Sequence, residues 1–243
     1  MLRFYTVIIT HLFSCIGFIC GLKKIIRHKD KYSEEEKYKY CRKIVHKVTK
    51  KSRATVKVFG TENLPEKPGY VMYSNHQGRF DGLAIIEAHE KPCTVVLNAN
   101  RGKAIFIRQF LEVLGAKKIV IGDLRSTAKL FREVEQEINE GRNYIIFPEG
   151  IFYDNKNTML DFHTGCMHFV YHSKCPIVPV TLYDTYKVYG VNSLKRVSCE
   201  VHFLEPIPYE DYKDLDKSEL ASVVKARIQA KLDELNESHK NMI

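Results

Sequence analysis

A histidine and an aspartate five positions apart are the first residues whose types and spacing suggest chemistry. His76 and Asp81 lie in the segment NHQGRFDG (residues 75–82), directly after an apolar run at residues 70–74. On one regular helix face the two side chains would be too far apart, but at a junction between a strand and a helix they can meet. A carboxylate that accepts a hydrogen bond from one imidazole nitrogen fixes the tautomer and stabilises the cation formed when the other nitrogen takes a proton. The pair therefore predicts a general base, without a nucleophilic side chain beside it, that deprotonates a substrate hydroxyl.

Two further segments are typical of strands that end in turns. The apolar run at residues 144–147 continues into Pro148, Glu149 and Gly150, and the segment CPIVPV begins at Cys175. A His/Asp pair needs a structural context before it indicates catalysis, and these segments supply one.

In this order and spacing the segments resemble the glycerolipid acyltransferase family, over about residues 55–207. The family's three blocks are Asn-His-x-x-x-x-Asp, Phe-Pro-Glu-Gly and a proline-containing apolar block. They are matched by Asn75, His76 and Asp81, by residues 147–150, and by residues 176–180.

The resemblance implies a mechanism. In that family the histidine removes a proton from the acceptor hydroxyl, the aspartate orients it, and the hydroxyl attacks an acyl thioester directly, without a metal or an acyl-enzyme. Carried over, His76 is the base and Asp81 its orienting partner, while Glu149 and Gly150 help to shape the acceptor site. Positioning and base catalysis can supply most of the acceleration, because the thiol is a good leaving group. No cofactor is expected.

The segment after Gly150 departs from the family pattern. The family usually continues with Thr-Arg, whose arginine binds the acceptor phosphate, whereas this chain has Ile151 and Phe152. A further block that normally carries a lysine and a Pro-x-x-Gly has Asn98 and Ile105 at those positions. An anionic acceptor needs arginine or lysine, so other residues are expected to contact it. The expected substrate-binding residues and nearby basic side chains are Asn75, Arg79, Arg101, Lys103, Arg108, Arg125, Glu149 and Gly150. For each basic residue the alternative is a solvated surface charge.

Three histidines raise the question of a metal site. His168 and His172 are one helical turn apart, and His163 lies shortly before them, close to Asp161. No other carboxylate or cysteine completes an obvious ligand set, and one helical pair is not sufficient. Core or surface histidines are therefore predicted, with no metal.

Short apolar runs that alternate with helical stretches predict the elements that position these residues. The strand candidates are residues 54–59, 70–74, 94–97, 118–121, 144–147, 177–182 and 198–204. The helical stretches are residues 81–89, 102–114, 125–140, 165–173 and 217–237. The pattern predicts a single α/β domain, residues 54–243, with a mixed, largely buried sheet flanked by helices.

The first 53 residues predict a membrane-binding segment of two helices in front of that domain. Residues 4–22 are uncharged and mostly apolar, and as a helix they would extend about 28 Å, close to the hydrocarbon thickness of a bilayer. Basic residues follow without a convincing cleavage site, which favours an anchor at the cytoplasmic face of the cell membrane over a signal peptide. Ser33 and Glu36 form a capping box that starts a basic amphipathic helix, typical of contact with the headgroups of membrane phospholipids. Whether residues 4–22 span the bilayer or lie in its interface stays open.

The excess positive charge is confined to the N-terminal quarter. Residues 1–58 carry 15 Lys/Arg and 4 Asp/Glu, whereas the remaining 185 residues carry 23 and 25. A soluble nucleic-acid-binding protein would carry its basic patch on the folded domain, so nucleic acid is not an expected partner. The seven cysteines include no C-x-x-C pair, which argues against a disulfide framework and for a reducing compartment.

Together these observations predict a membrane-bound acyltransferase of phospholipid biosynthesis. The donor would be a thioester of acyl carrier protein or coenzyme A, and the acceptor 1-acylglycerol-3-phosphate, giving phosphatidic acid. A close alternative keeps this chemistry with another lysophospholipid or glycerol-3-phosphate as acceptor. Two alternatives from other classes are a membrane-tethered binding protein without catalysis and a metallohydrolase in which His76 and Asp81 are metal ligands.

Overall fold

The computed structural model describes residues 3, 6, 12–99, 105–120, 122–153 and 155–240. Within this part of the chain seven strands form one sheet, and each lies within two residues of a predicted strand. The strands are β1 (Ala54–Phe59), β2 (Val71–Ser74), β3 (Cys93–Asn98), β4 (Lys117–Ile119), β5 (Asn143–Ile146), β6 (Ile177–Tyr183) and β7 (Val197–Phe203).

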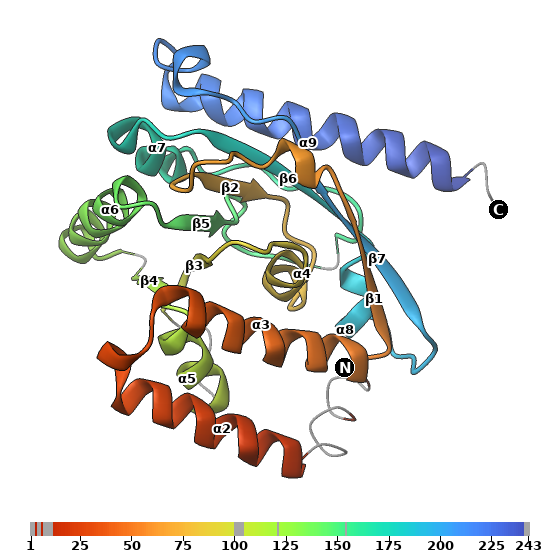
Figure 1. Cartoon of the computed structure of the whole chain (residues 1–243). Coiled ribbons are helices and arrows are strands. Elements are labelled where there is room, and N and C mark those ends of the chain that lie inside the picture. The colour runs from red at the N-terminus through yellow and green to blue at the C-terminus, as the bar shows by residue number, and fades with distance from the viewer. Residues whose placement is uncertain are drawn as a thin grey trace.

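The sheet is mixed, as predicted, with the strand order β1-β7-β6-β2-β5-β3-β4. Strands β6, β2, β5, β3 and β4 are parallel, whereas β7 runs antiparallel to β6 and pairs in parallel with β1. The carboxyl ends of β2, β5 and β6 therefore meet at one edge of the sheet, where open α/β sheets bind their ligands (Figure 1).

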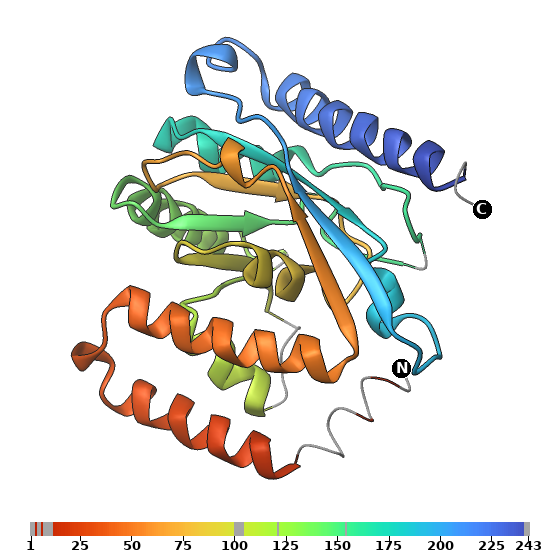
Figure 2. The same ribbon diagram turned by 45° about the vertical axis from the view of Figure 1, so that its right-hand side comes forward.

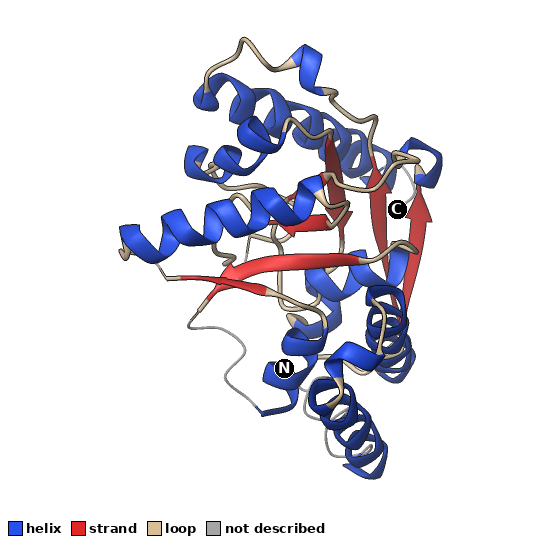
Figure 3. Cartoon of the chain, turned by 60° about the vertical axis from the view of Figure 1, so that its left-hand side comes forward, coloured by secondary structure: helices blue, strands red, loops and turns tan. Residues whose placement is uncertain are grey.

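Helices cover both faces of the sheet (Figure 3). They are α2 (Leu12–Arg27), α3 (Glu34–Lys51), α4 (Asp81–Ala88), α5 (Ile105–Val113), α6 (Leu124–Asn139), α7 (His168–Ser173), α8 (Tyr186–Tyr189) and α9 (Lys217–Lys240). Successive residues of a strand point to opposite faces, so each central strand contributes to two hydrophobic clusters. Tyr70 and Met72 pack in the cluster that includes residues of α2 to α5, and Val71 and Tyr73 in the cluster that includes residues of α6, α7 and α9.

The second N-terminal helix begins with the predicted capping box. The Ser33 hydroxyl accepts a hydrogen bond from the Glu36 main-chain N–H over 3.1 Å, and the Glu36 carboxylate accepts one from the Ser33 N–H over 2.8 Å. The apolar face of α3 is buried against the rest of the protein, since Tyr38 and Ile44 belong to the same cluster as Met72. Most basic residues of α3 are exposed, whereas Lys37 and Arg42 are partly buried. The exposed ones include Lys39, Lys43, Lys47 and Lys50.

Helices α2 and α3 lie side by side at one end of the molecule (Figure 2). Leu22 and Ile25 of α2 are buried in the same cluster as the sheet. Of the predicted anchor, residues 4–22, the structure describes only Thr6 and residues 12–22. Among the described helices, none combines the length and the apolar character that crossing a bilayer requires. The division of the chain at residue 53 stays a prediction, while the helices before it share a core with the strands after it.

Candidate active site

His76 and Asp81 meet at the carboxyl edge of the sheet. His76 follows the end of β2, and Asp81 is the first residue of α4, so a short turn brings the two side chains together. The Nδ1 atom of His76 lies 2.7 Å from the Asp81 carboxylate, and Asp81 is fully buried. The contact expected from their spacing at a strand–helix junction is therefore present.

The Asp81 carboxylate is held in place by its surroundings. The oxygen that faces His76 also accepts hydrogen bonds from the main-chain N–H groups of Gln77 and Gly78, the latter over 2.8 Å. Because an ionised carboxylate can only accept, Nδ1 of His76 must donate to it, and Nε2 is then the nitrogen that can take a proton. No described residue forms a hydrogen bond with Nε2.

Two phenylalanines fix the imidazole ring of His76. Phe147 stacks on the ring with 4.4 Å between the centroids, and Phe152 approaches it edge-on at 4.6 Å. The His76 side chain keeps 17% of its surface exposed. A ring that is oriented by Asp81, clamped between aromatic side chains and open to solvent fits the role of a general base.

Glu149 joins the ends of two neighbouring strands. It follows β5, is almost completely buried, and accepts a hydrogen bond from the His76 main-chain N–H over 2.7 Å and one from the Leu160 N–H over 2.8 Å. Burial raises the pKa of the Glu149 carboxyl to about 7, although these hydrogen bonds lower it. Both of its oxygens are used within the protein, so Glu149 shapes the site by positioning the turn that carries His76.

Gly150 turns the chain directly after Glu149. Its φ angle is +69°, a left-handed conformation that glycine adopts at little cost. A Cβ atom at this position would lie 3.1 Å from Cδ2 of His163. The requirement for glycine is thus both conformational and steric.

Asn75 and Gln77 attach the turn to strand β6. Asn75 is fully buried and exchanges two hydrogen bonds with the main chain of Leu182, at 3.0 and 2.8 Å. Gln77, 2% exposed, donates to the Leu182 carbonyl and to Asn157 and accepts from Thr185. Asn75 was expected to contact substrate, but its amide is occupied by Leu182. No local pattern in the sequence marks Gln77, because its partners are about a hundred positions away.

Among the predicted basic residues that the structure describes, only Arg79 lies on the turn of His76. Arg79 is exposed on the turn before α4, Arg108 is exposed on α5, and Arg101 and Lys103 lie outside the described residues. Arg125 lies in the first turn of α6, after β4, which is three strands from β2 in the sheet. At roughly 4.8 Å per strand, this displacement is about 14 Å along the edge.

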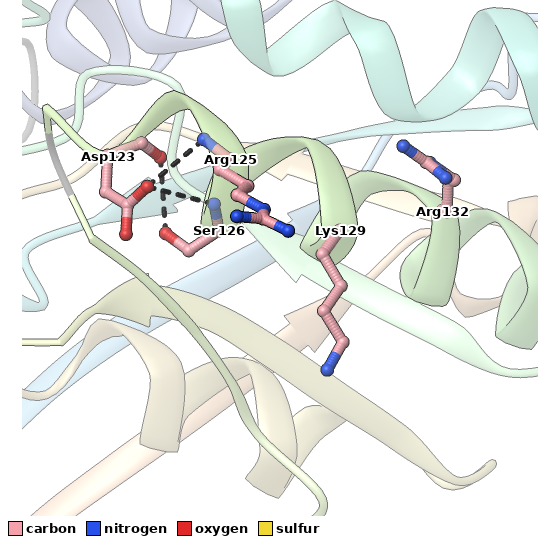
Figure 4. Close-up of a pocket in the computed structure, with 5 residues that line it drawn as sticks. All are labelled: Asp123, Arg125, Ser126, Lys129 and Arg132. Carbon is pink, nitrogen blue, oxygen red and sulfur yellow. Dashed lines mark hydrogen bonds between the residues drawn. The ribbon is translucent and has the colours of Figure 1, made fainter.

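Arg125 lines a surface hollow of about 500 Å³ (Figure 4). Asp123 caps the helix there by accepting hydrogen bonds from the N–H groups of Arg125 and Ser126, at 3.1 and 3.0 Å. Three basic side chains line the hollow: Arg125 is in the first turn of α6, Lys129 is one turn further along and pairs with Glu133 over 3.7 Å, and Arg132 is in the middle of the helix. The residues that line the hollow are Asp123, Arg125, Ser126, Lys129 and Arg132.

The histidines of α7 differ from expectation in one respect. The sequence showed no carboxylate that completes a set with His168 and His172, but Glu135 of α6 lies beside them. That expectation was wrong because Glu135 reaches the pair through the packing of α6 on α7, which local spacing does not reveal.

Comparisons with known proteins identify a family and relatives with similar sequences. The Acyltransferase family model matches residues 55–183, more than half of the chain. A 1-acyl-sn-glycerol-3-phosphate acyltransferase of Saccharomyces cerevisiae is 29% identical over 189 residues, which cover 75% of this chain and 61% of the yeast protein. A protein of the same name from Borreliella burgdorferi is 26% identical over 178 residues, covering 72% of this chain and 71% of its own. The matched region thus spans less than two thirds of the yeast protein.

One solved structure shows the same fold. The crystal structure of the 1-acyl-sn-glycerophosphate (LPA) acyltransferase PlsC from Thermotoga maritima is similar with a TM-score of 0.74 at 19% sequence identity. The similarity covers 96% of this chain and 94% of that one.

Proposed function

Because the chain belongs to the acyltransferase family, we propose that it transfers a fatty acyl group from an acyl thioester to the free hydroxyl of 1-acylglycerol-3-phosphate, giving phosphatidic acid. The observation that carries this proposal is the pair of His76 and Asp81 at the carboxyl edge of the sheet, with Nδ1 bonded to the carboxylate and Nε2 left to accept a proton. The names of the relatives support lysophosphatidic acid as the acceptor.

In the proposed mechanism Nε2 of His76 takes the proton of the acceptor hydroxyl as its oxygen attacks the thioester carbonyl carbon. The imidazolium that forms is stabilised by Asp81, whose carboxylate is already oriented by two main-chain N–H groups. When the tetrahedral intermediate collapses, the C–S bond breaks and the thiolate takes up the proton from His76. One thioester bond is thereby replaced by one ester bond, and the base is restored.

Binding of the acceptor phosphate is assigned to basic side chains at the same edge of the sheet. Arg79 lies on the turn of His76, and Arg125 lies in the first turn of α6, with Lys129 one turn further along the helix. Ile151 stands where the family usually has threonine and Phe152 where it has arginine. This departure leaves another lysophospholipid or glycerol-3-phosphate as the alternative acceptor. Either acyl carrier protein or coenzyme A remains a possible donor.

The proposed location is the cytoplasmic face of a membrane, held there through the N-terminal helices. Lysines along α3 are exposed, and so are Lys23, Lys24 and Arg27 at the end of α2. Such a surface attracts anionic headgroups by about 1 kcal/mol per basic residue near the bilayer. Both the lysophospholipid and the two-chain product would then stay close to the active site.

The test is acyl transfer by the full-length protein purified in detergent, with chelator present. Labelled acyl-coenzyme A and acyl carrier protein thioesters would each be offered with lysophosphatidic acid, a zwitterionic lysophospholipid or glycerol-3-phosphate. Phosphatidic acid from wild type and from the exposed-histidine control His28→Ala, but not from His76→Ala, is the expected result. Product formed only with a different acceptor would identify that acceptor as the substrate. The absence of product with every donor and acceptor would refute it.

A further inference from the structure

A group of side chains that could bind a metal ion lies between α6 and α7, away from the candidate active site. His168 and His172 are one turn apart on α7, with 4.6 Å between their ring centroids, and Glu135 approaches them from α6. One ligand atom from each of the three residues lies within 4.8 Å of the other two. Helices α6 and α7 lead towards the amino ends of β5 and β6, whereas His76 follows the carboxyl end of β2. The group is therefore at the opposite edge of the sheet.

The carboxylate of Glu135 has an unsatisfied oxygen. Its Oε1 atom is buried and has no hydrogen-bond partner among the described residues. It faces Nε2 of His168 at 3.6 Å, which is too long for a hydrogen bond. In a tetrahedral site with bonds of about 2.0–2.1 Å, neighbouring ligand atoms are about 3.3–3.4 Å apart. The separation of the two atoms is thus close to that of two ligands of one metal ion.

We propose that Glu135, His168 and His172 form a three-ligand site for Zn²⁺ or a similar first-row divalent cation, with water completing the coordination. Imidazole nitrogens and a carboxylate oxygen are the donor set that such ions bind. Binding requires the exposed His172 ring to turn by a rotamer adjustment. The ring of His168 is more restricted, because Phe131 packs on it with 4.4 Å between the centroids.

The surroundings of the site include one positive charge that opposes a cation. The ammonium of Lys217 lies 3.4 Å from Nδ1 of His168 and repels a cation at the site. Since Lys217 is exposed at the start of α9, it can move aside when the ion binds. Its removal is therefore expected to tighten binding.

Binding of the ion would link two helices on one face of the sheet. Glu135 belongs to α6 and the two histidines to α7, so the ion would cross-link elements that otherwise contact each other through side-chain packing. A ligand that binds the folded state stabilises it in proportion to the logarithm of its concentration. The inference does not depend on the proposed reaction, because the residues lie at the opposite edge of the sheet.

The experiment is a calorimetric titration of the full-length protein, freed of any polyhistidine tag, with Zn²⁺ alone. The exposed Cys20 is replaced by serine in all samples to remove a competing thiol. We expect saturable one-to-one binding, a rise in Tm with Zn²⁺, and a loss of affinity of at least about tenfold in Glu135→Gln and in His172→Gln. Lys217→Gln is expected to increase the affinity, and His28→Gln, at an exposed histidine elsewhere, to leave it unchanged.

Because His172 is exposed, its variant should fold normally, and the Tm without metal checks this. One-to-one binding that persists unchanged in both ligand variants would place the ion elsewhere and overturn the proposal. So would the absence of saturable binding by a protein that folds normally.

Discussion

Glu149, at the end of β5, accepts a hydrogen bond over 2.7 Å from the main-chain N–H of His76, at the end of β2. Two of the sequence blocks thus meet through a side chain of one and the backbone of the other. The same carboxylate holds the N–H of Leu160, so it fixes the segment after β5 as well. In the proposed mechanism the glutamate therefore positions the base and does not need to touch the reacting atoms.

Replacing this glutamate should slow the reaction while the fold is kept. In Glu149→Gln the amide oxygen can accept a hydrogen bond from only one of the two main-chain N–H groups. The NH₂ group then faces the other N–H, and two donors cannot form a hydrogen bond. We expect the turn of His76 to shift and kcat to fall by about 10²-fold, as for a misplacement of about 1 Å. Steady-state kinetics would be compared with Glu62→Gln, an exposed glutamate. An unchanged kcat would exclude the positioning role.

The charge of Asp81 should matter more to kcat than to KM. Asp81→Asn preserves size and can still accept one hydrogen bond, but it removes the negative charge that stabilises the imidazolium. We expect kcat to fall by about 10²- to 10⁴-fold, with KM for the acceptor nearly unchanged. The exposed Asp211→Asn serves as the control. A loss confined to KM would assign Asp81 to substrate binding instead.

Buried His89 should make the protein sensitive to acid. Burial lowers its pKa to about 4, and its neutral ring is bonded to the Tyr70 hydroxyl and the Lys91 carbonyl, each at 2.7 Å. The unfolded chain takes up the proton near pH 6.5, so the stabilisation is complete above that pH and is lost as the pH falls towards 4. This titration is expected to lower the free energy of unfolding by about 3 kcal/mol between pH 6.5 and pH 4.

Urea unfolding of wild type and His89→Gln at several pH values measures this effect. The variant should be less stable than wild type at pH 7. The difference between their free energies of unfolding should become smaller by about 3 kcal/mol at pH 4. His28→Gln, at an exposed histidine, should show no such trend. A gap that stays constant with pH would mean that His89 does not titrate in this way.

The exposed lysines of α3 should control binding to anionic membranes. Changing Lys39, Lys43 and Lys50 to glutamine removes about 1 kcal/mol each, so partition into vesicles with anionic lipid should weaken by about 10²-fold. Cosedimentation at low salt would measure it, and added salt should reduce wild-type binding. The control triple changes exposed lysines at or next to α7 and α9, helices at the other end of the molecule from α2 and α3 (Figure 1). These are Lys174, Lys213 and Lys240. An equal loss of vesicle binding in both triple variants would exclude a specific role of α3 and would indicate a general effect of net charge.

The sequence allowed the elements to be predicted well, because apolar runs and helical periodicity are local patterns. The approach of His76 to Asp81 was also predictable, since both lie within one short turn. Contacts made across the sheet were not. Gln77 meets Leu182 only because β2 pairs with β6, and Glu135 meets His168 only because α6 packs on α7. Roles in phosphate binding depend on where long side chains converge, which neither spacing nor charge specifies.

The parallel pairing of β1 with β7 also affects how the chain folds. β1 is an edge strand whose only neighbour in the sheet is β7, and the register joins Ala54 to Val197. Contacts between residues so far apart in sequence slow folding, because a long loop must close before they form. During synthesis β1 emerges from the ribosome early and waits for its neighbour until nearly the whole chain has been translated. An unpaired edge of this kind can associate with other chains until β7 has been synthesised and pairs with it.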